Sequence, residues 1–239
     1  MNIIYIHRAN FNKRPPVISC VLNLLSLNHN VVLITTGITN RLRDELETKG
    51  AQIIIVPYKM HNNFFELITH TIKYRNQIKK ILKRFKMNNY VLWIEGNYTI
   101  GSLFGIINNY SYILQIQELH KNKIEFHLIK QVIHKALIVF MPEYNRAFLY
   151  KVFFKLKDIP TILPNKPYFI PSTEEMNILK NKYSDIIRSI EGRKIILYQG
   201  GLSKERDLSP FIKAISKLEN KYVLILMGKD YGVMEQYKS

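Results

Sequence analysis

The sequence contains little cysteine, no long apolar run and few acidic residues. Among its 239 residues Cys20 is the single cysteine, which excludes a disulfide framework or a cysteine zinc site and is typical of a reducing compartment. No apolar run approaches the ~20 residues that a membrane-spanning helix needs. His7 and Arg8 interrupt the first run, which is too short for a secretory signal. We therefore expect a cytoplasmic globular protein.

Several motifs of known chemistry are also missing. The sequence has no GxGxxG after its first apolar run, no GxxxxGK[ST], no GxSxG, no HExxH and no Asp-x-Asp. His120, His127 and His134 are seven residues apart, whereas histidine ligands on one helix are usually three or four apart. We predict no metal site and no bound cofactor.

Acidic residues are outnumbered: 35 Lys and Arg against 18 Asp and Glu give a formal charge of +17. Such a charge favours an anionic partner, which could be a nucleic acid, an anionic membrane or a phosphorylated substrate. The alternative is a solvated surface in a lysine-rich chain. No nucleic-acid motif accompanies the charge, so we do not expect a nucleic-acid partner.

The segment from Leu67 to Ile94 contains no acidic residue at all. Apolar residues recur there at helical spacing, which predicts an amphipathic helix with a basic face over residues 73–86. That face could lie against anionic lipid head groups, as a peripheral attachment to the inner side of a membrane. The predicted membrane-facing residues are Lys79, Lys80, Lys83 and Arg84.

Strand and helix patterns alternate for about 165 residues, with nearly continuous apolar strands, as in a parallel sheet that is covered on both faces. After a connector between Pro167 and Pro171, Ser172 and Glu175 are spaced as a helix-starting capping box, and the strand–helix pattern begins again. We predict an α/β protein of two Rossmann-like doubly wound domains, residues 1–168 and 169–239, the second incomplete.

Ligands of open parallel sheets bind beyond the carboxyl ends of the strands. At one such end, "YQGGLSKERDL" places Gly200 and Gly201 in a tight turn before a helix, with Lys204 and Arg206 nearby. Backbone amides and basic side chains in such a turn could hold a diphosphate. An ordinary strand-to-helix turn with exposed charges is the alternative.

Two other strand ends carry polar residues. In "IQELH", Glu118 could orient or deprotonate an acceptor and His120 could contact a sugar or phosphate, unless both belong to a solvated loop. In "HRANFNKRPPV", Arg8 and Arg14 follow the first strand, where they could bind an acceptor or a phosphate. A solvated basic loop is again the alternative.

Together these segments resemble the two-domain GT-B glycosyltransferases, in particular the retaining family 4. The most specific stretch is "KIILYQGGLSKERDLSPFIKAISKL", and "VVLITTG", "LQIQELHKN" and "VFMPEYNRAFL" extend the resemblance over most of the chain. The resemblance implies an N-terminal acceptor domain and a C-terminal nucleotide-sugar-binding domain. Arg206 matches the lysine of the family's basic pair, whereas Gly201 stands where its first basic residue would be, and His120 matches the family histidine near the transferred sugar.

The implied reaction is transfer of a hexosyl group from a nucleotide diphosphate sugar, with retention and without a metal, to a lipid-linked or polysaccharide acceptor in cell-surface glycan synthesis. The family's later glutamate pair would lie beyond Ser239, so the chain resembles a C-terminally truncated transferase. Two alternatives stay open: an inactive transferase fragment, and a non-catalytic basic protein that binds a membrane or nucleic acid.

Overall fold

The structure is a computed structural model that describes residues 1–59, 63–86, 89–120, 122–169 and 171–237. The chain divides into two compact units, Met1–Phe169 and Ile170–Ser239, and each is described by itself. The roles predicted for the two domains stay predictions.

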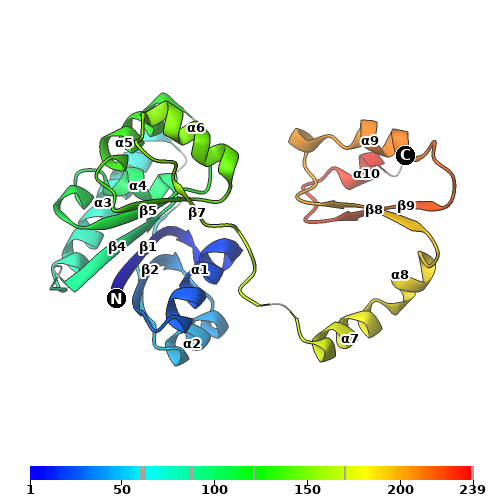
Figure 1. The fold of residues 1–239 in the computed structure, drawn as a ribbon, viewed down its shortest axis with the longest axis horizontal. Coiled ribbons are helices and arrows are strands. Elements are labelled where there is room, and N and C mark those ends of the chain that lie inside the picture. The colour runs from blue at the N-terminus through cyan, green and yellow to red at the C-terminus, as the bar shows by residue number, and fades with distance from the viewer. Residues whose placement is uncertain (60–62, 87–88, 121, 170, 238–239) are drawn as a thin grey trace. The chain divides into compact units, whose positions relative to one another are not determined.

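The first unit is built on a seven-stranded sheet in the order β3-β2-β1-β4-β5-β6-β7, in which every described pairing is parallel (Figure 1). The order reverses direction between β1 and β4, which are neighbours in the sheet although two strands separate them in the sequence. A doubly wound parallel sheet was predicted, and for this unit the prediction is confirmed. Its strands are β1 (Asn2–Asn10), β2 (Asn30–Gly37), β3 (Gln52–Ile55), β4 (Tyr90–Glu95), β5 (Tyr112–Gln115), β6 (Ile138–Met141) and β7 (Thr161–Ile162).

Helices cover both faces of this sheet (Figure 1). One face packs against α1 (Pro15–Ser26) and α2 (Asn40–Thr48). The other face packs against a row of four helices, namely α3 (Phe64–Leu82), α4 (Asn97–Leu103), α5 (Lys123–Ile133) and α6 (Tyr144–Phe154).

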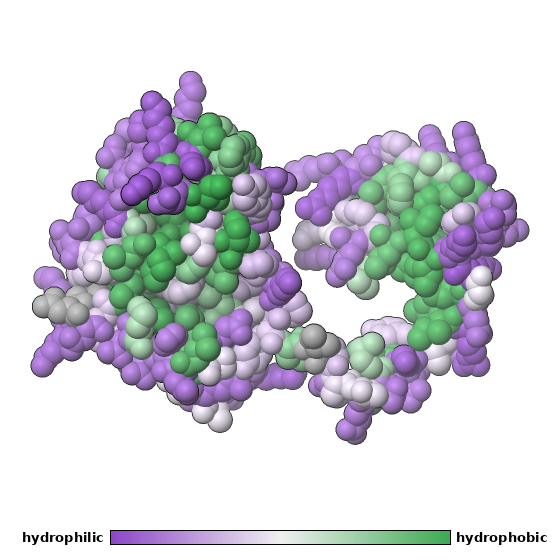
Figure 2. Space-filling model, in the orientation of Figure 1, coloured by the Kyte–Doolittle hydropathy of each residue, from purple (hydrophilic) through white to green (hydrophobic). Residues whose placement is uncertain are grey.

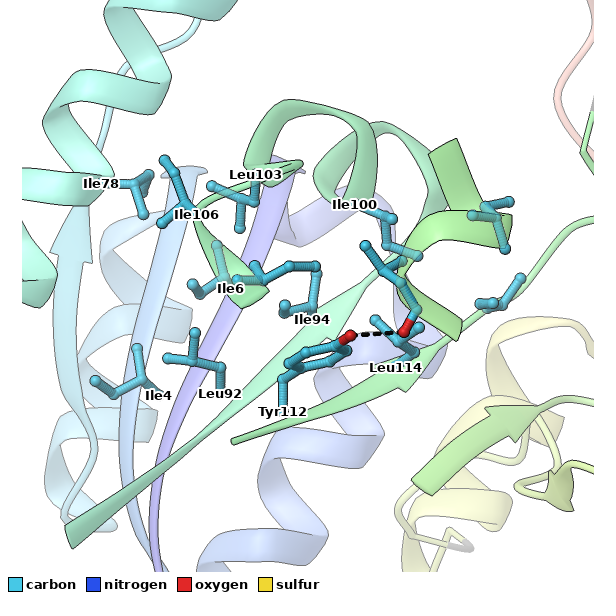
Figure 3. Packing of buried hydrophobic residues seen from close by; sticks show 14 of the residues in the cluster. Ile4, Ile6, Ile78, Leu92, Ile94, Ile100, Leu103, Ile106, Tyr112 and Leu114 are labelled. Atoms are coloured by element: carbon cyan, nitrogen blue, oxygen red, sulfur yellow. Dashed lines mark hydrogen bonds between the residues drawn. The ribbon is translucent and has the colours of Figure 1, made fainter. Parts of the chain in front are cut away.

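Each strand contributes side chains to two separate cores, one on each face of the sheet, because successive side chains of a strand point to opposite faces. Figure 3 shows Ile4 and Ile6 of β1 beside Ile94 of β4, facing Ile100 and Leu103 of α4. The hydroxyl of Tyr112 donates to the carbonyl of Val132 at 2.6 Å in the same layer, and burial raises the pKa of that tyrosine to about 12.

The opposite core contains a buried polar contact. The side-chain oxygen of Gln115 accepts hydrogen bonds from the hydroxyl of Tyr5 and from Nε1 of Trp93, each at 2.8 Å. Gln115 is 2% exposed, and the rings of Tyr5 and Trp93 stack with centroids 5.8 Å apart. One amide oxygen on β5 thus accepts from two buried donors, one on β1 and one on β4.

We predict that Gln115→Leu lowers the free energy of unfolding by about 2–4 kcal/mol, because both buried donors lose their acceptor. Urea unfolding followed through the fluorescence of Trp93, the only tryptophan, measures the change. Gln131→Leu, on the exposed side of α5, is the control and should change stability by less than about 0.5 kcal/mol. Equal unfolding midpoints for the two variants would contradict the role of this contact.

The second unit is a small two-stranded parallel sheet of β8 (Lys194–Gln199) and β9 (Tyr222–Met227). Ile195 and Leu197 of β8 stay 54% and 53% exposed, and Figure 2 shows apolar surface over these strands. The described part of the unit thus leaves one face of its sheet uncovered. Its helices are α7 (Thr173–Lys182), α8 (Ser184–Ser189), α9 (Ser209–Ile215) and α10 (Met234–Tyr237).

The structure corrects three local predictions. The helix that begins after Ser172, where the capping box predicted a start, ends at Lys182, and the pattern of one helix up to residue 190 is interrupted at Tyr183. A second helix, α8, follows, and neither α7 nor α8 buries any of its residues. Strand β1 continues to Asn10, so Arg8 lies in a strand and not in a loop. Strand β5 ends at Gln115, which leaves Glu118 in the following loop.

The helix predicted from the acid-free segment is α3, and it starts earlier than expected. Tyr74, Ile78, Ile81 and Leu82 are its buried residues. Lys79 and Lys80 on the helix, and Lys83 and Arg84 just after it, are all exposed. Among the described helices, none is both long enough and apolar enough to span a bilayer.

Candidate functional site

A cavity of about 340 Å³ opens in the first unit at the carboxyl ends of β1, β4 and β5, where the strand order reverses. Its wall combines the end of β1, the start of α4 and the loop after β5. This is the position at which open parallel sheets bind their ligands. The lining residues are His7, Arg8, Ala9, Arg14, Glu95, Gly96, Asn97, Tyr98, Thr99, Gln117, Glu118 and Glu125.

Unpartnered buried polar atoms are concentrated at this cavity. Six buried side-chain nitrogen or oxygen atoms in the described part of the chain have no hydrogen-bond partner, and four of them belong to lining residues. Buried polar groups in folded proteins nearly always have partners, so a cluster of exceptions indicates a place where a ligand or ordered water binds. The four atoms are Nε2 of His7, Nε of Arg8, Oδ1 of Asn97 and Oε1 of Gln117.

His7 and Glu95 form the most buried polar contact of the site. They are register partners on β1 and β4, so their side chains point to the same side of the sheet. Nδ1 of His7 contacts Oε2 of Glu95, and the two residues are only 3% and 4% exposed. A carboxylate accepts hydrogen bonds, so Nδ1 is the donor of this contact. In the neutral imidazole, Nε2 is then the nitrogen with a free lone pair.

Arg8 is held against two aromatic rings. Its guanidinium carbon lies 4.4 Å from the ring centroid of Tyr58 and 5.6 Å from that of Tyr98. Its backbone N–H donates to Oγ1 of Thr99 at 3.0 Å, and its side chain donates to Oγ of Ser102. Burial lowers the pKa of the Arg8 guanidinium. The side chain is thereby a fixed, partly desolvated cation in the cavity wall.

The cavity brings together residues that the sequence placed at two different strand ends: Arg8 and Arg14 after the first strand, and Glu118 in the segment after β5. Glu118 is exposed and pairs with Arg146 of α6 at 3.5 Å, while Arg146 also donates to the carbonyl of Gln117. The loop after β5 is thus fixed to α6 beside the cavity.

His120 is not among the residues that line the cavity. Its ring lies among the rings of Phe126, Tyr150, Phe153 and Phe154, with centroids 5.0–6.2 Å away. Its Nδ1 is buried and has no partner in the described chain. The early end of β5 turns this residue toward α5 and α6, and a catalytic role for His120 stays a prediction.

The glycine turn of the second unit is close-packed. Gly200 leads out of β8, and a Cβ at this position would lie 3.0 Å from a guanidinium nitrogen of Arg206 and 3.0 Å from the hydroxyl of Tyr198. The Tyr198 hydroxyl donates to the carbonyl of Gly201 at 3.1 Å. The Arg206 guanidinium therefore folds back against the glycine turn. Both Lys204 and Arg206 are exposed, and their role in binding a diphosphate stays a prediction.

The helix after this turn differs from the expected phosphate cradle. It begins at Ser209 and has only seven residues. Its first amide donates to the Asp207 carboxylate at 2.9 Å, and the Ser209 hydroxyl donates to the same oxygen at 2.6 Å. These bonds lower the pKa of Asp207. The first amide of α9 is thus already occupied by a carboxylate.

Gly228 directly follows β9 and was not singled out from the sequence. It determines how closely the turn after β9 can approach the glycine turn after β8. A Cβ at Gly228 would lie 1.7 Å from the carbonyl oxygen of Gly200, so no side chain fits without moving the backbone. The ends of β8 and β9 stay joined beyond the strands, since the amide of Leu202 donates to the carbonyl of Lys229 at 2.9 Å.

We predict that Gly228→Ala disorders the turn at Gly200 and weakens pairing at the ends of β8 and β9, because backbone atoms must separate to admit the methyl group. Amide hydrogen exchange should be at least about tenfold faster at Leu202 and Tyr231, whose amides bond across the two turns. Lys217→Ala, on the exposed surface of the same unit, is the control. Unchanged exchange in Gly228→Ala would contradict the close packing.

Sequence reasoning missed His7 and Glu95, although a signal for both was present. Each is a titratable residue at the end of an apolar run of the sequence, His7 after residues 3–6 and Glu95 after residues 91–94. Only the pairing of β1 with β4 makes them neighbours. Within the described residues, no three His, Cys, Asp or Glu side chains are grouped closely enough to hold a metal ion.

Comparison with known proteins gives similarity in structure alone. No protein-family model matches the sequence, and no curated protein sequence matches it either. Anabaena HepE, solved in complex with UDP, matches with a TM-score of 0.66 at 9% identity, over 100% of this chain and 64% of HepE. Sucrose-phosphate synthase from Thermosynechococcus elongatus matches with a TM-score of 0.65 at 11% identity, over 100% of this chain and 68% of the synthase.

A UDP-N-acetylglucosamine 2-epimerase also matches, with a TM-score of 0.58 at 9% identity, over 99% of this chain and 71% of the epimerase. At such low identities the matches define a fold, which is that of part of a GT-B chain. The chain spans less than two thirds of the length of HepE. Because the same fold includes transferases and an epimerase, the function has to be argued from the site.

Proposed function

We propose that this chain belongs to a glycosyltransferase that moves a hexosyl group from a nucleotide diphosphate sugar to a hydroxyl of a saccharide or lipid-linked acceptor. The observation that carries the proposal is the cavity at the β1–β4 switch point, with four unpartnered polar atoms and the His7–Glu95 contact in its wall. A sugar hydroxyl both donates and accepts hydrogen bonds, so a saccharide can satisfy lone pairs and N–H groups of this kind.

His7 is the residue that we propose as the general base. Glu95 holds the imidazole through Nδ1 and stabilises the positive charge that forms when Nε2 takes a proton. In the step, the acceptor oxygen forms a bond to the anomeric carbon, the bond from that carbon to the diphosphate oxygen breaks, and the hydroxyl proton moves to Nε2. Nε2 of His7 is buried, so acceptor binding requires the groups around this nitrogen to move.

Direct displacement assisted by a base inverts the anomeric configuration. The family resemblance instead implies retention, in which the diphosphate itself takes the acceptor proton. The buried His7–Glu95 contact favours inversion over retention, because a base beside the acceptor has no use in the second mechanism. The anomeric configuration of the product, read from its proton NMR spectrum, distinguishes the two mechanisms.

The donor would be bound by the second unit. Arg206, folded against the glycine turn, is the proposed partner of the diphosphate, and Lys204 supplies a second, exposed charge nearby. HepE, which shares this fold, was solved with UDP and with glucose. A uridine diphosphate sugar is therefore the first donor to test.

We expect Arg206→Ala to weaken UDP binding by roughly tenfold, since a charge-assisted contact to phosphate is lost. Isothermal titration calorimetry on the 239-residue chain measures the affinity. Lys217→Ala removes one positive charge from the same unit without touching the turn and should leave the affinity unchanged. Equal affinity of Arg206→Ala and the unaltered protein would remove Arg206 from the donor site.

We expect His7→Gln to slow sugar transfer by roughly 100-fold or more, the usual contribution of a general base, while UDP affinity stays the same. Glu95→Gln keeps the shape of the contact but removes the charge, and it should slow transfer less. His127→Gln, an exposed histidine of α5, is the control. Transfer that survives His7→Gln would contradict the proposed base, and conversion of the donor sugar without an acceptor would favour an epimerase.

A further inference from the structure

The first half of α3 exposes an apolar stripe. Phe64 and Phe65 are 67% and 81% exposed, and Ile68 and Ile72 are 41% and 50% exposed. Phe65, Ile68 and Ile72 are three or four residues apart, so they lie on one side of the helix. The opposite side of α3 is the one that enters the core, through Tyr74, Ile78, Ile81 and Leu82. The stripe is therefore additional to the face that the fold uses.

The same side of the helix becomes basic in its second half. Lys79 and Lys83 continue the three-to-four spacing of the stripe, and both are exposed. Lys73, Lys80 and Arg84 flank them, and the segment has no carboxylate after Glu66. One continuous surface thus joins an apolar end to a cationic end. We call the residues Phe64, Phe65, Ile68, Ile72, Lys79, Lys80 and Lys83 the α3 surface.

The apolar end of the α3 surface is connected to the cavity through packed side chains. Tyr58, whose ring lies under the Arg8 guanidinium, has its hydroxyl 3.3 Å from that of Thr71 on α3. Its ring also packs edge-on against Tyr74 of α3, with centroids 5.9 Å apart. Arg75 of α3 donates to the carbonyl of Phe104, at the end of the helix that lines the cavity. The surface and the cavity are therefore parts of one rigid unit.

We propose that the α3 surface docks the protein on an anionic phospholipid bilayer, with Phe64, Phe65, Ile68 and Ile72 inserted among the lipids and the lysines on the head groups. An interfacial helix is bound by this combination of apolar burial and attraction to anionic lipid. The proposal rests on the proposed function in one respect only: it makes the acceptor of the cavity a lipid-linked saccharide that is reached from the bilayer surface.

Vesicle binding of the unaltered chain, without nucleotide, tests the docking separately from sugar transfer. The probes are vesicles of phosphatidylglycerol with phosphatidylcholine and vesicles of phosphatidylcholine alone, measured by co-sedimentation. We expect binding to the first kind that is stronger by about tenfold or more. Equal binding to both kinds, or binding to neither, would overturn the proposal without affecting the donor site.

Two double variants distinguish the contribution of the inserted apolar side chains to vesicle binding from the contribution of the lysine charges. Phe65→Ser with Ile72→Ser should weaken binding to the anionic vesicles by roughly tenfold at low and at high salt, because apolar burial is not screened. Lys79→Ala with Lys83→Ala should weaken it by a similar factor at low salt and by much less at high salt. Leu27→Ser, at an equally exposed position after α1 (65% exposed), is the matched control and should change nothing.

Insertion itself is read from a reporter at the centre of the stripe. Phe65→Trp should shift its emission to shorter wavelength on anionic vesicles and be quenched by brominated lipid, whereas Leu27→Trp should do neither. If Phe65→Ser with Ile72→Ser instead abolishes self-association in sedimentation velocity and leaves vesicle binding intact, the α3 surface joins two copies of this chain and the membrane proposal is wrong.

Discussion

The register between β1 and β4 is the constraint on which the site depends. These strands are 88 residues apart at His7 and Glu95, yet the pairing places the two residues opposite each other where the sheet changes direction. Separating the partners would leave a buried charge or a buried imidazole without compensation, at a cost of about 3–5 kcal/mol. The contact is thus held by the strand pairing, and the cavity forms around it.

Several features of the fold followed from the sequence, because they depend on local patterns. Apolar runs located the strands, helical spacing located α3, and the glycine pair marked the end of β8. The His7–Glu95 contact did not follow, since it depends on which strands become neighbours, and a single sequence does not state that order. The proximity of Gly228 to Gly200 was equally hidden, because it is a contact between two turns.

The candidate site was only partly predictable for a related reason. Arg8, Arg14 and Glu118 follow apolar runs and could be named from that pattern, whereas Asn97 and Gln117 look like ordinary loop residues. Their importance comes from unpartnered oxygens beside one cavity. Such atoms lower stability when nothing binds them and gain hydrogen bonds when a polyhydroxyl ligand arrives. Selectivity for a saccharide would arise from that difference.

The role of the His7–Glu95 contact is tested most directly by finding which ring nitrogen of His7 carries the proton. Long-range nitrogen–proton correlation spectra of the imidazole report which ring nitrogen carries the proton and which accepts a hydrogen bond. The account predicts a proton on Nδ1, held by Glu95, and an Nε2 shift that changes when a saccharide acceptor is added. A proton confined to Nε2, or an Nε2 shift that no saccharide alters, would contradict the central claim that this contact serves an acceptor hydroxyl.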